Sequence, residues 1–238
     1  MYKNKKISVS IPIFNEEKHI KEVVRNIPKW VDLVVVVNDA STDNSEKILN
    51  KLAIKNTKLK LISAKENLGV GASILTAHNF AFKSGYDISV VINGDNQMDT
   101  TYLPKLLEPL VKKEANFTKG MRLYPGGTTG MPLIRLLGNI YASLILKIAT
   151  QYWKVSDPLN GYTAITKEMF SKLDKRKLEK RFGYETSLII ELSKKKAKIV
   201  DVKIPAIYGS EETKLKTLPF FIEFHKLVFR KITLKQIR

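Results

Sequence analysis

The sequence predicts an α/β protein built on a mostly parallel sheet with helices on both faces. The first third of the chain alternates short runs rich in β-branched residues with stretches whose apolar residues recur every three or four positions. Strands that alternate with helices are typical of parallel sheets, because each helix carries the chain back to the start of the next strand. With 238 residues, 44% of them hydrophobic, the chain is long enough for one large domain with its own core.

The expected elements follow from this alternation in chain order. Strands are expected at residues 7–13, 33–37, 59–62 and 88–92, and then at 115–121, 163–165 and 199–204. Helices are expected up to residue 27, around 48–52, over 72–83, from residue 100 or 101 with a threonine hydroxyl as N-cap, over 133–149, and after residue 182.

A polar cluster follows each of the first four expected strands. The clusters are Asn15-Glu16, Asn38-Asp39, Asn67 with Gly69 and Gly71, and Asn93 to Gln97. Because ligands of open α/β sheets bind beyond the carboxyl ends of the strands, these clusters predict one shared site. Their carboxylate and amide oxygens suit a divalent metal that carries a phosphate. The alternative for any single cluster is an ordinary polar turn. The two glycines could let the backbone approach an anion at the start of a helix, or they could simply form a tight turn.

Composition limits the classes of partner. The formal net charge is +18, with three histidines and no cysteine, so neither disulfides nor a multi-histidine zinc site is expected. The lysines are spread over the expected helices without an aromatic-basic motif, so no nucleic-acid partner is expected. Three explanations of the positive charge remain: phosphorylated substrates, an anionic membrane surface, or merely a solvated lysine-rich surface. No signal peptide and no uncharged apolar run of about 18 residues is apparent, so no bilayer-spanning segment is expected.

Four motifs, in this order, resemble those of the family 2 glycosyltransferases. They lie at residues 11–17, 37–43, 67–71 and 93–97. The resemblance covers residues 7–216. Within the family, the sequence most resembles the dolichol-phosphate mannose synthases and the bacterial polyprenyl-phosphate glycosyltransferases. It implies that residues 1–216 have the nucleotide-sugar-binding fold called GT-A, with a Rossmann-like sheet.

The resemblance also implies a donor site. It assigns the nucleotide-diphosphate sugar, of UDP or GDP type, to Pro12, Phe14, Asn15, Glu16, Asp39, Asp43, Asn67, Gly69, Gly94 and Asp95. Glu16 would reach the ribose, Asp39 would accept a hydrogen bond from a base N–H, and Asp43 would support its loop. Asp95 and Gln97 would hold a divalent metal, Mg²⁺ or Mn²⁺. Asn93 stands where the family usually has a first aspartate, so the implied metal site lacks one negative charge.

The implied acceptor side lies in the second half of the chain. By resemblance, Arg122 is expected near phosphates, Asp157 near the reacting sugar and Glu185 near the acceptor. A hydroxyl acceptor would need Asp157 as general base, whereas a phosphate acceptor is already an oxyanion near neutral pH. Lys214 and Lys216 resemble part of a loop that closes on phosphates, although the arginine usual in that loop is missing.

Two amphipathic segments indicate a membrane surface. In residues 133–149 a broad apolar face lies opposite a narrow polar stripe that includes Arg135 and Asn139. This segment is either a core helix with a solvated edge or an interfacial helix that offers these two side chains to a lipid phosphate. Residues 217–238 form a basic amphipathic tail that suits an anionic membrane, and relatives often continue from there into transmembrane helices.

Together these observations favour a metal-dependent inverting glycosyltransferase on the cytoplasmic side of a membrane. It would move a sugar from a nucleotide-diphosphate donor to polyprenyl phosphate. The alternatives are transfer to a hydroxyl of a glycan or lipid-linked sugar, a nucleotidyltransferase, and a non-catalytic scaffold of the same fold. The turn at residues 14–17 argues against a nucleotidyltransferase, which usually has a glycine-rich basic loop there.

Overall fold

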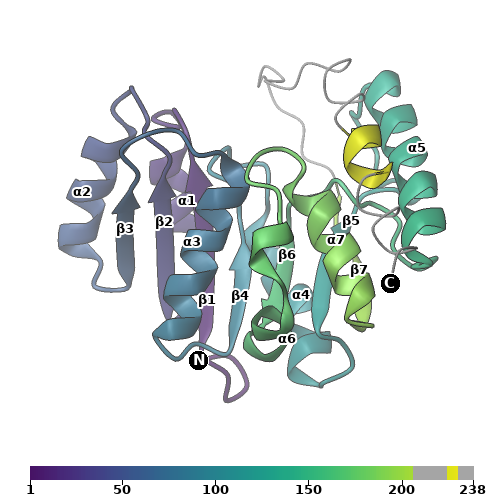
Figure 1. Cartoon of the computed structure of the whole chain (residues 1–238). Helices are drawn as coiled ribbons and strands as arrows, with labels where there is room; N and C mark the ends of the chain where they lie inside the picture. The colour runs from purple at the N-terminus through teal and green to yellow at the C-terminus, as the bar shows by residue number, and fades with distance from the viewer. Residues whose placement is uncertain (206–223, 230–238) are drawn as a thin grey trace.

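The structure, a computed structural model, describes residues 1–205 and 224–229. At its centre is one seven-stranded sheet with the strand order β3-β2-β1-β4-β6-β5-β7 (Figure 1). β6 is antiparallel to both of its neighbours, whereas the other paired strands are parallel. The predicted mostly parallel α/β sheet is therefore confirmed.

The first half of the chain forms the parallel part of the sheet. Its elements are β1 (Ile7–Ile13), α1 (Ile20–Asn26), β2 (Leu33–Asn38), α2 (Ser45–Lys55), β3 (Leu59–Ser63), α3 (Val70–Lys83) and β4 (Ile88–Val91). β1, β2 and β4 are buried along their whole length, which is why their sequences are mostly continuous apolar runs. Ile13 pairs with Asn38 and Asn38 with Ser63, so β1, β2 and β3 end level with one another.

The second half adds the remaining strands and a second group of helices. Its elements are η1 (Thr100–Tyr102), α4 (Leu103–Val111), β5 (Phe117–Met121), α5 (Leu133–Thr150), β6 (Thr163–Thr166), α6 (Lys167–Lys172), η2 (Lys175–Lys177), α7 (Tyr184–Lys194) and β7 (Ile199–Lys203). The turn before α4 is capped by Asp99, whose side chain accepts from the N–H of Thr101, and not by a threonine hydroxyl. No pattern predicts α6, because six residues are too few to show a helical period.

Helices cover both faces of the sheet, as predicted. On one face the core joins β1, β2 and β4 to α1 and α4, with Ile11, Val36 and Leu106 fully buried. On the other face Val35 packs with Ala77 of α3, and α6 and α7 complete the cover. Figure 1 shows α3, α6 and α7 in front of the sheet and α4 behind it. Each fully buried aliphatic side chain contributes about 1.5–3 kcal/mol, so this core fixes the strand ends firmly.

A buried polar network lies on the α3 side of the sheet. Nδ1 of His78 is 2.8 Å from Oγ of Ser89 in β4 and 3.4 Å from Oγ of Ser10 in β1. Phe82 and Phe170 pack against the imidazole ring. Burial lowers the pKa of His78 to about 3, so the ring is neutral when it joins the helix to the two strands.

Acid is expected to destabilise the protein through His78. The unfolded chain takes up a proton near pH 6.5 but the folded state only near pH 3, so stability is complete above pH 6.5 and falls as the pH drops. Between pH 7.5 and pH 5 this group alone lowers the free energy of unfolding by about 2 kcal/mol. Guanidinium unfolding at the two pH values measures the loss. The His78→Gln variant should lose correspondingly less, and an equal loss would assign the acid sensitivity to other groups.

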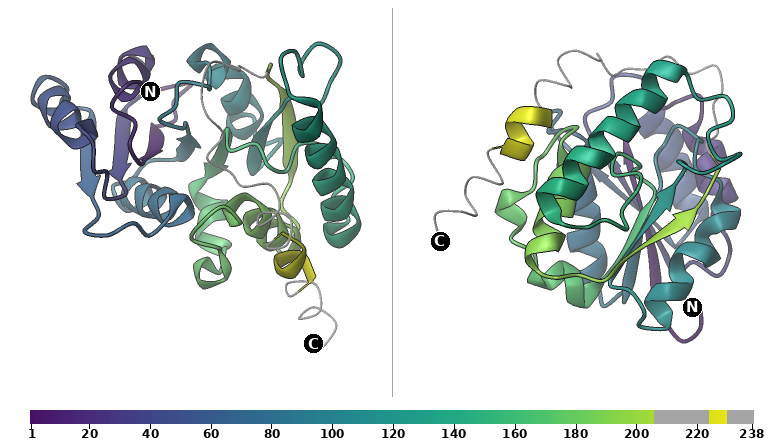
Figure 2. Two further views of the ribbon diagram at one scale, coloured as in Figure 1. Left: turned by 90° about the horizontal axis from the view of Figure 1, so that it is seen from above. Right: turned by 90° about the vertical axis from the view of Figure 1, so that its right-hand side faces the viewer.

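α5 lies outside the β7 edge of the sheet and packs on α7 and on residues 224–229 (Figure 2). Within the described part of the chain it is the one helix long and apolar enough to cross a bilayer, judged by length and composition alone. The helix contains Arg135 and Lys147, so the expectation, which concerned runs without charged residues, stays a prediction. Residues 224–229, from the predicted basic tail, bury Phe224, Leu227 and Val228 against the protein.

Candidate functional site

Hydrogen bonds join the loops that follow β1 and β2. Oδ1 of Asn15 accepts from the backbone N–H of Thr42 at 2.8 Å. The Asp43 carboxylate accepts from the N–H groups of Glu17 at 3.0 Å and Ser45 at 2.9 Å. Burial alone would raise the pKa of Asp43, but these hydrogen bonds outweigh it and the pKa is lowered. Asp43 thus occupies the loop-supporting position expected for it.

The other residues predicted for the nucleoside pocket lie at the end of β1. Pro12 is buried within the strand, whereas Phe14 is 39% exposed at the site edge. Glu16 lies against Gly94 in the loop after β4. A Cβ built on Gly94 would lie 2.7 Å from Cγ2 of Ile13 and 3.2 Å from Cγ of Glu16, so glycine is needed for these two loops to approach so closely.

Asp39 directly follows β2 and holds the turn that begins α3. It is 4% exposed, and its two oxygens accept from the N–H groups of Leu68 and Gly69, both at 2.8 Å. Nδ2 of Asn67 donates to the Asp39 carbonyl oxygen at 3.3 Å. A carboxylate has about four acceptor positions, so Asp39 can also accept from a base N–H, and that role stays a prediction.

The glycines of this turn pack against protein. Gly69 has a φ of +100°, and a Cβ there would lie 2.5 Å from the carbonyl oxygen of Lys180. At Gly71 a Cβ would collide with the carbonyl oxygen of Glu179 and lie 2.8 Å from Cβ of Tyr184. The glycines are therefore needed for a tight turn and for the close packing of residues 179–184 on α3, which agrees with the tight-turn alternative. The assignment of Gly69 to the donor site stays a prediction.

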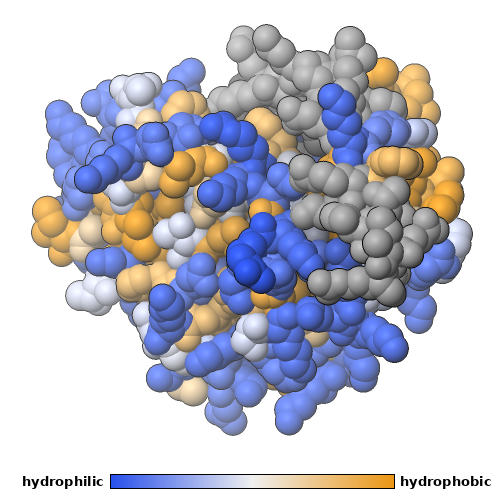
Figure 3. Space-filling view, viewed as in Figure 1, coloured by the Kyte–Doolittle hydropathy of each residue, from blue (hydrophilic) through white to orange (hydrophobic). Residues whose placement is uncertain are grey.

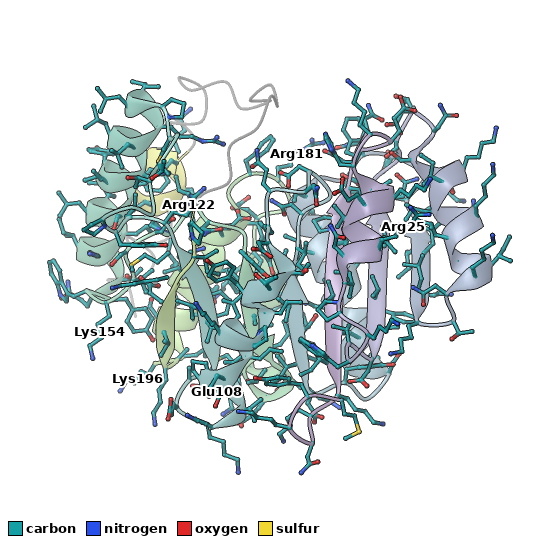
Figure 4. The ribbon with its side chains drawn as sticks, turned by 180° about the vertical axis from the view of Figure 1, so that it is seen from behind. Arg25, Glu108, Arg122, Lys154, Arg181 and Lys196 are labelled. Carbon is teal, nitrogen blue, oxygen red and sulfur yellow. The ribbon has the colours of Figure 1, made fainter. Side chains whose placement is uncertain are left out.

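Arg181, which no motif indicates, lies at the same edge (Figure 4). Its Nη1 donates to Oδ1 of Asn67 at 3.3 Å and its Nη2 to the Asn67 carbonyl oxygen at 3.2 Å. The side chain is exposed, and a guanidinium has further donors with which to meet a phosphate. In the sequence Arg181 looks like any other basic residue, because its place depends on how residues 179–181 fold back onto α3.

The loop after β4 carries the predicted metal ligands. Oδ1 of Asp95 accepts from the N–H of Gln97 at 3.1 Å, and the N–H of Asn93 donates to Sδ of Met98 at 3.3 Å. The described residues contain no group of three histidine, cysteine, aspartate or glutamate side chains that could hold a metal. The candidate ligands are one carboxylate and two side-chain amides, a set that suits Mg²⁺ or Mn²⁺ once phosphate oxygens complete the coordination.

Arg122 and Asp157 form a bidentate ion pair between the end of β5 and the turn before β6. Nε donates to Oδ2 at 2.7 Å, Nη2 donates to Oδ1 at 3.0 Å, and the Arg122 N–H also donates to Oδ2 at 3.0 Å. The Asp157 side chain is fully buried, whereas 19% of the Arg122 side chain is exposed. This corrects the expectation that Asp157 faces the reacting sugar: its carboxylate positions Arg122 beside α5 (Figure 4).

Glu185, near the start of α7, faces the loop after β4. A Cβ built on Gly161 would lie 3.5 Å from Oε1 of Glu185 and 3.7 Å from Nδ2 of Asn93, so both side chains lie beside this glycine. Burial raises the pKa of Glu185. The structure therefore brings an acceptor-side residue of the sequence prediction next to a donor-side one.

A buried lysine lies beneath this part of the site. Lys119 of β5 is 1% exposed, and its ammonium donates to the carbonyl oxygen of Asn160. Burial lowers the pKa of Lys119 to about 8, against the attraction of Asp157, Glu185 and Asp201. Burial also raises the pKa of Asp201 to about 6. No motif predicts this charge cluster, since it forms only when β5, β6 and β7 pair.

Arg135 and Asn139, the predicted lipid-phosphate ligands, lie one turn apart on the same side of α5 but differ in exposure. Arg135 is partly exposed near the first turn of the helix. Asn139 is 5% exposed, and its Nδ2 lies 3.7 Å from Sδ of Met131, so it faces the protein. The expectation for Asn139 is therefore corrected, while Lys214 and Lys216 lie outside the described residues.

The outward side of α5 is apolar. Its large exposed side chains are Leu133, Ile134, Leu137, Ile140, Tyr141, Leu144 and Ile148. The buried side of the helix is mixed and consists of Asn139, Ala142, Ser143, Leu146 and Thr150. Figure 3 shows apolar side chains along this edge of the molecule. A surface helix in water usually exposes a polar side, so this exposed apolar side is unusual and marks a place where another apolar surface can bind.

Comparison with known proteins identifies the family. A family model described as glycosyl transferase family 2 matches residues 8–174. The UDP-N-acetylglucosamine–dolichyl-phosphate N-acetylglucosaminyltransferase of Methanococcus voltae is 30% identical over 246 residues, which cover 98% of this chain and 97% of that protein. The undecaprenyl-phosphate mannosyltransferase of Micrococcus luteus is 24% identical over 202 residues, covering 82% of this chain and 80% of that protein.

A solved structure agrees in fold. Glucosyl-3-phosphoglycerate synthase of Mycobacterium tuberculosis, crystallised with Mn²⁺ and UDP-glucose, superposes with a TM-score of 0.72 at 20% identity. The match covers 97% of this chain and 80% of that one. The sheet, the motifs at its strand ends and these similarities lead to one conclusion: the chain has the GT-A fold and belongs to glycosyl transferase family 2.

Proposed function

We propose that this protein transfers a sugar from a uridine-diphosphate sugar to the phosphate of a polyprenyl lipid, with inversion, at the cytoplasmic side of a membrane. The Methanococcus voltae relative, similar over nearly its whole length, is named for UDP-N-acetylglucosamine and dolichyl phosphate, which supports this donor and acceptor class. The Mycobacterium tuberculosis structure with UDP-glucose and Mn²⁺ supports a uridine donor and a divalent metal. N-acetylglucosamine is therefore the sugar to test first.

The exposed apolar side of α5 is the observation that supports the lipid acceptor. The chain leaves β5 at Arg122 and enters α5 after one loop, so the first turn of α5 is the end nearest the site. A polyprenyl phosphate is apolar along its chain and anionic at one end. Its chain can lie among lipids along the apolar side of α5 while its phosphate meets Arg122, Arg135 and the helix N-terminus, which attracts anions.

The residues of the site would then divide the work. Asp95, with help from Gln97 and Asn93, would hold a Mg²⁺ or Mn²⁺ ion, which would supply positive charge to neutralise the departing diphosphate. Glu185 would accept hydrogen bonds from sugar hydroxyls and fix the orientation of the ring. A phosphate oxygen of the acceptor attacks the anomeric carbon while the bond from that carbon to the diphosphate breaks and UDP leaves.

A phosphate acceptor also agrees with the state of Asp157. Transfer to a hydroxyl requires a base within hydrogen-bond reach of the proton that is removed. The Asp157 carboxylate is fully buried and already accepts three hydrogen bonds from Arg122. A phosphate monoester carries its charge near neutral pH and needs no base, so the hydroxyl alternative gains no support from this geometry.

UDP with Mn²⁺ is expected to raise the melting temperature by about 5–10 °C. At a ligand concentration of 100 times Kd, binding adds about 2.7 kcal/mol to the free energy of unfolding. GDP with Mn²⁺ and UDP with a chelator are the controls, and both should give smaller shifts. A protein whose melting temperature responds to no nucleotide with any metal would contradict the donor site.

The acceptor is tested by its headgroup. With UDP-N-acetylglucosamine, transfer is expected to a polyprenyl phosphate and not to the matching polyprenol, which differs only in lacking the phosphate. Transfer to the polyprenol at a similar rate would contradict the phosphate acceptor. The reaction would then require a general base to deprotonate the hydroxyl.

A further inference from the structure

The end of α5 remote from the site leads into a group of exposed basic side chains. We call Trp153, Lys154, Lys195, Lys196 and Lys198 the basic corner; Trp153 is 58% exposed, and all four lysines are exposed. Figure 4 labels Lys154 and Lys196 at the same corner of the molecule. The lysine run at the end of α7 thus has neighbours that its sequence alone does not indicate.

The basic corner is built by contacts between two segments far apart in the chain. The Tyr152 hydroxyl, just after α5, donates to the carbonyl oxygen of Ala197 at 2.6 Å. Ala197 lies in the turn between α7 and β7 and is itself buried. This bond places residues 153–154 beside residues 195–198, so the proximity of their charges is fixed by the fold.

A groove opens at the basic corner. Its volume is about 530 Å³, and its lining includes Trp153, Lys154, Lys198, Val155 and Glu114. An indole and aliphatic side chains beside two ammonium groups suit a ligand that is apolar in one part and anionic in another. Glu114 is the one acidic residue of the lining, so the cations outnumber it.

The basic corner continues the apolar side of α5. The exposed apolar residues of the helix reach Ile148, and Trp153 follows a few positions later with Lys154 next to it. Exposed aliphatic side chains that are followed along the chain by an aromatic and a basic one are in the order found across a membrane interface. Lysines just outside the apolar region attract anionic headgroups.

The topology separates the basic corner from the sugar-transfer site. β7 is parallel to β5, so Lys198, which precedes β7, lies at the amino edge of the sheet, whereas Arg122 lies at the opposite, carboxyl edge. α5, with 18 residues, spans the distance between the two edges, about 27 Å. The basic corner therefore contacts neither donor nor acceptor phosphate.

We propose that the basic corner binds the headgroups of anionic phospholipids. α5 is then held at both ends, by the acceptor lipid near Arg122 and by the basic corner, and it lies along the bilayer surface. This inference rests on the proposed function only in that α5 meets a membrane, and it adds a lipid site that plays no part in sugar transfer.

Reversing charge at the basic corner is expected to weaken membrane binding selectively. The double variant Lys154→Glu with Lys198→Glu should bind vesicles of phosphatidylcholine with phosphatidylglycerol at least about tenfold more weakly than the unchanged protein. The matched control is Lys47→Glu with Lys51→Glu, two exposed lysines of α2 near the opposite, β3 edge of the sheet. Both variants change net charge equally, and the control should bind like the unchanged protein. Brominated lipids should quench Trp153, and the Trp153→Phe variant should lose that quenching.

Several outcomes would overturn the proposal. Equal weakening by both double variants would show that the binding depends only on net charge. Equal binding to vesicles of pure phosphatidylcholine would exclude anionic headgroups as the ligand. Competition by millimolar inorganic phosphate would identify a soluble anion as the ligand. The UDP-induced rise in melting temperature should be unchanged in the Lys154/Lys198 variant, which shows that it folds and that its donor site is intact. Vesicle binding that survives in this variant overturns the proposal whether or not UDP binds.

Discussion

Replacing Asp95 with asparagine is expected to lower the rate of sugar transfer at least about a hundredfold. Asp95 is the carboxylate of the proposed ligand set, because Asn93 and Gln97 provide only neutral amide oxygens. Without that charge the site loses most of its attraction for a divalent ion, and the developing charge on the diphosphate is no longer neutralised. The measurements are turnover with UDP-N-acetylglucosamine and the Mn²⁺-dependent part of the UDP thermal shift, which should disappear.

Two further variants of the same loop sharpen this test. Asp99→Asn makes the same chemical change four positions later, at a carboxylate that caps the turn before α4. It should change stability little, because asparagine caps a helical turn about as well as aspartate, and it should leave the metal dependence unchanged. Asn93→Asp adds the missing charge and should lower the Mn²⁺ concentration needed for half-maximal activity. An Asp95→Asn enzyme with normal metal dependence would place the metal elsewhere.

The Asp157→Asn variant is expected to lower the free energy of unfolding by about 3 kcal/mol. The substitution leaves the Arg122 guanidinium, which is 19% exposed, without the buried carboxylate that it now binds through two nitrogens. For a protein of this size the loss corresponds to a fall in melting temperature of about 10 °C. Turnover should fall as well, because Arg122 is no longer held at the site edge.

The matched control removes a carboxylate from an exposed ion pair. Glu168 binds Lys172 at 2.6 Å, with 71% and 53% of the two side chains exposed. The Glu168→Gln variant should melt at the same temperature as the unchanged protein, because water screens such pairs. If Asp157→Asn also melted normally and lost only turnover, Asp157 would be a catalytic base and its positioning role would be refuted.

Much of the sheet follows from local patterns in the sequence. β1, β2 and β4 are buried on both faces, so their residues form apolar runs with sharp ends, and polar motifs begin where the runs stop. Those motifs could be joined into one site because the carboxyl ends of parallel strands meet at one edge. The observed loop contacts between Asn15 and Thr42, and between Glu17 and Asp43, agree with that reasoning.

The direction of individual side chains could not be predicted in the same way. Asn139 and the apolar residues of α5 define an amphipathic helix, but the pattern does not say which side faces the protein. Asp157 is buried only because Arg122 arrives from β5. Arg181 reaches Asn67 only because the segment before α7 packs on the glycines of α3. Each of these facts depends on contacts between segments far apart in the chain, and the local pattern of apolar and polar residues does not predict such contacts.

β6 runs against its neighbours, and its amino end therefore reaches the site edge. The Lys119 ammonium donates to the Asn160 carbonyl oxygen, and Nδ2 of Asn160 donates to the carbonyl of the residue after Lys119 at 2.9 Å. Sliding a strand by one residue turns every side chain to the other face. Such a slide would break both bonds and leave a buried ammonium without its acceptor. The bond from Lys119 thus fixes the register of β5 against the turn before β6 and keeps Gly161 next to Asn93 and Glu185. The geometry of the site therefore depends on a residue that need not contact a substrate.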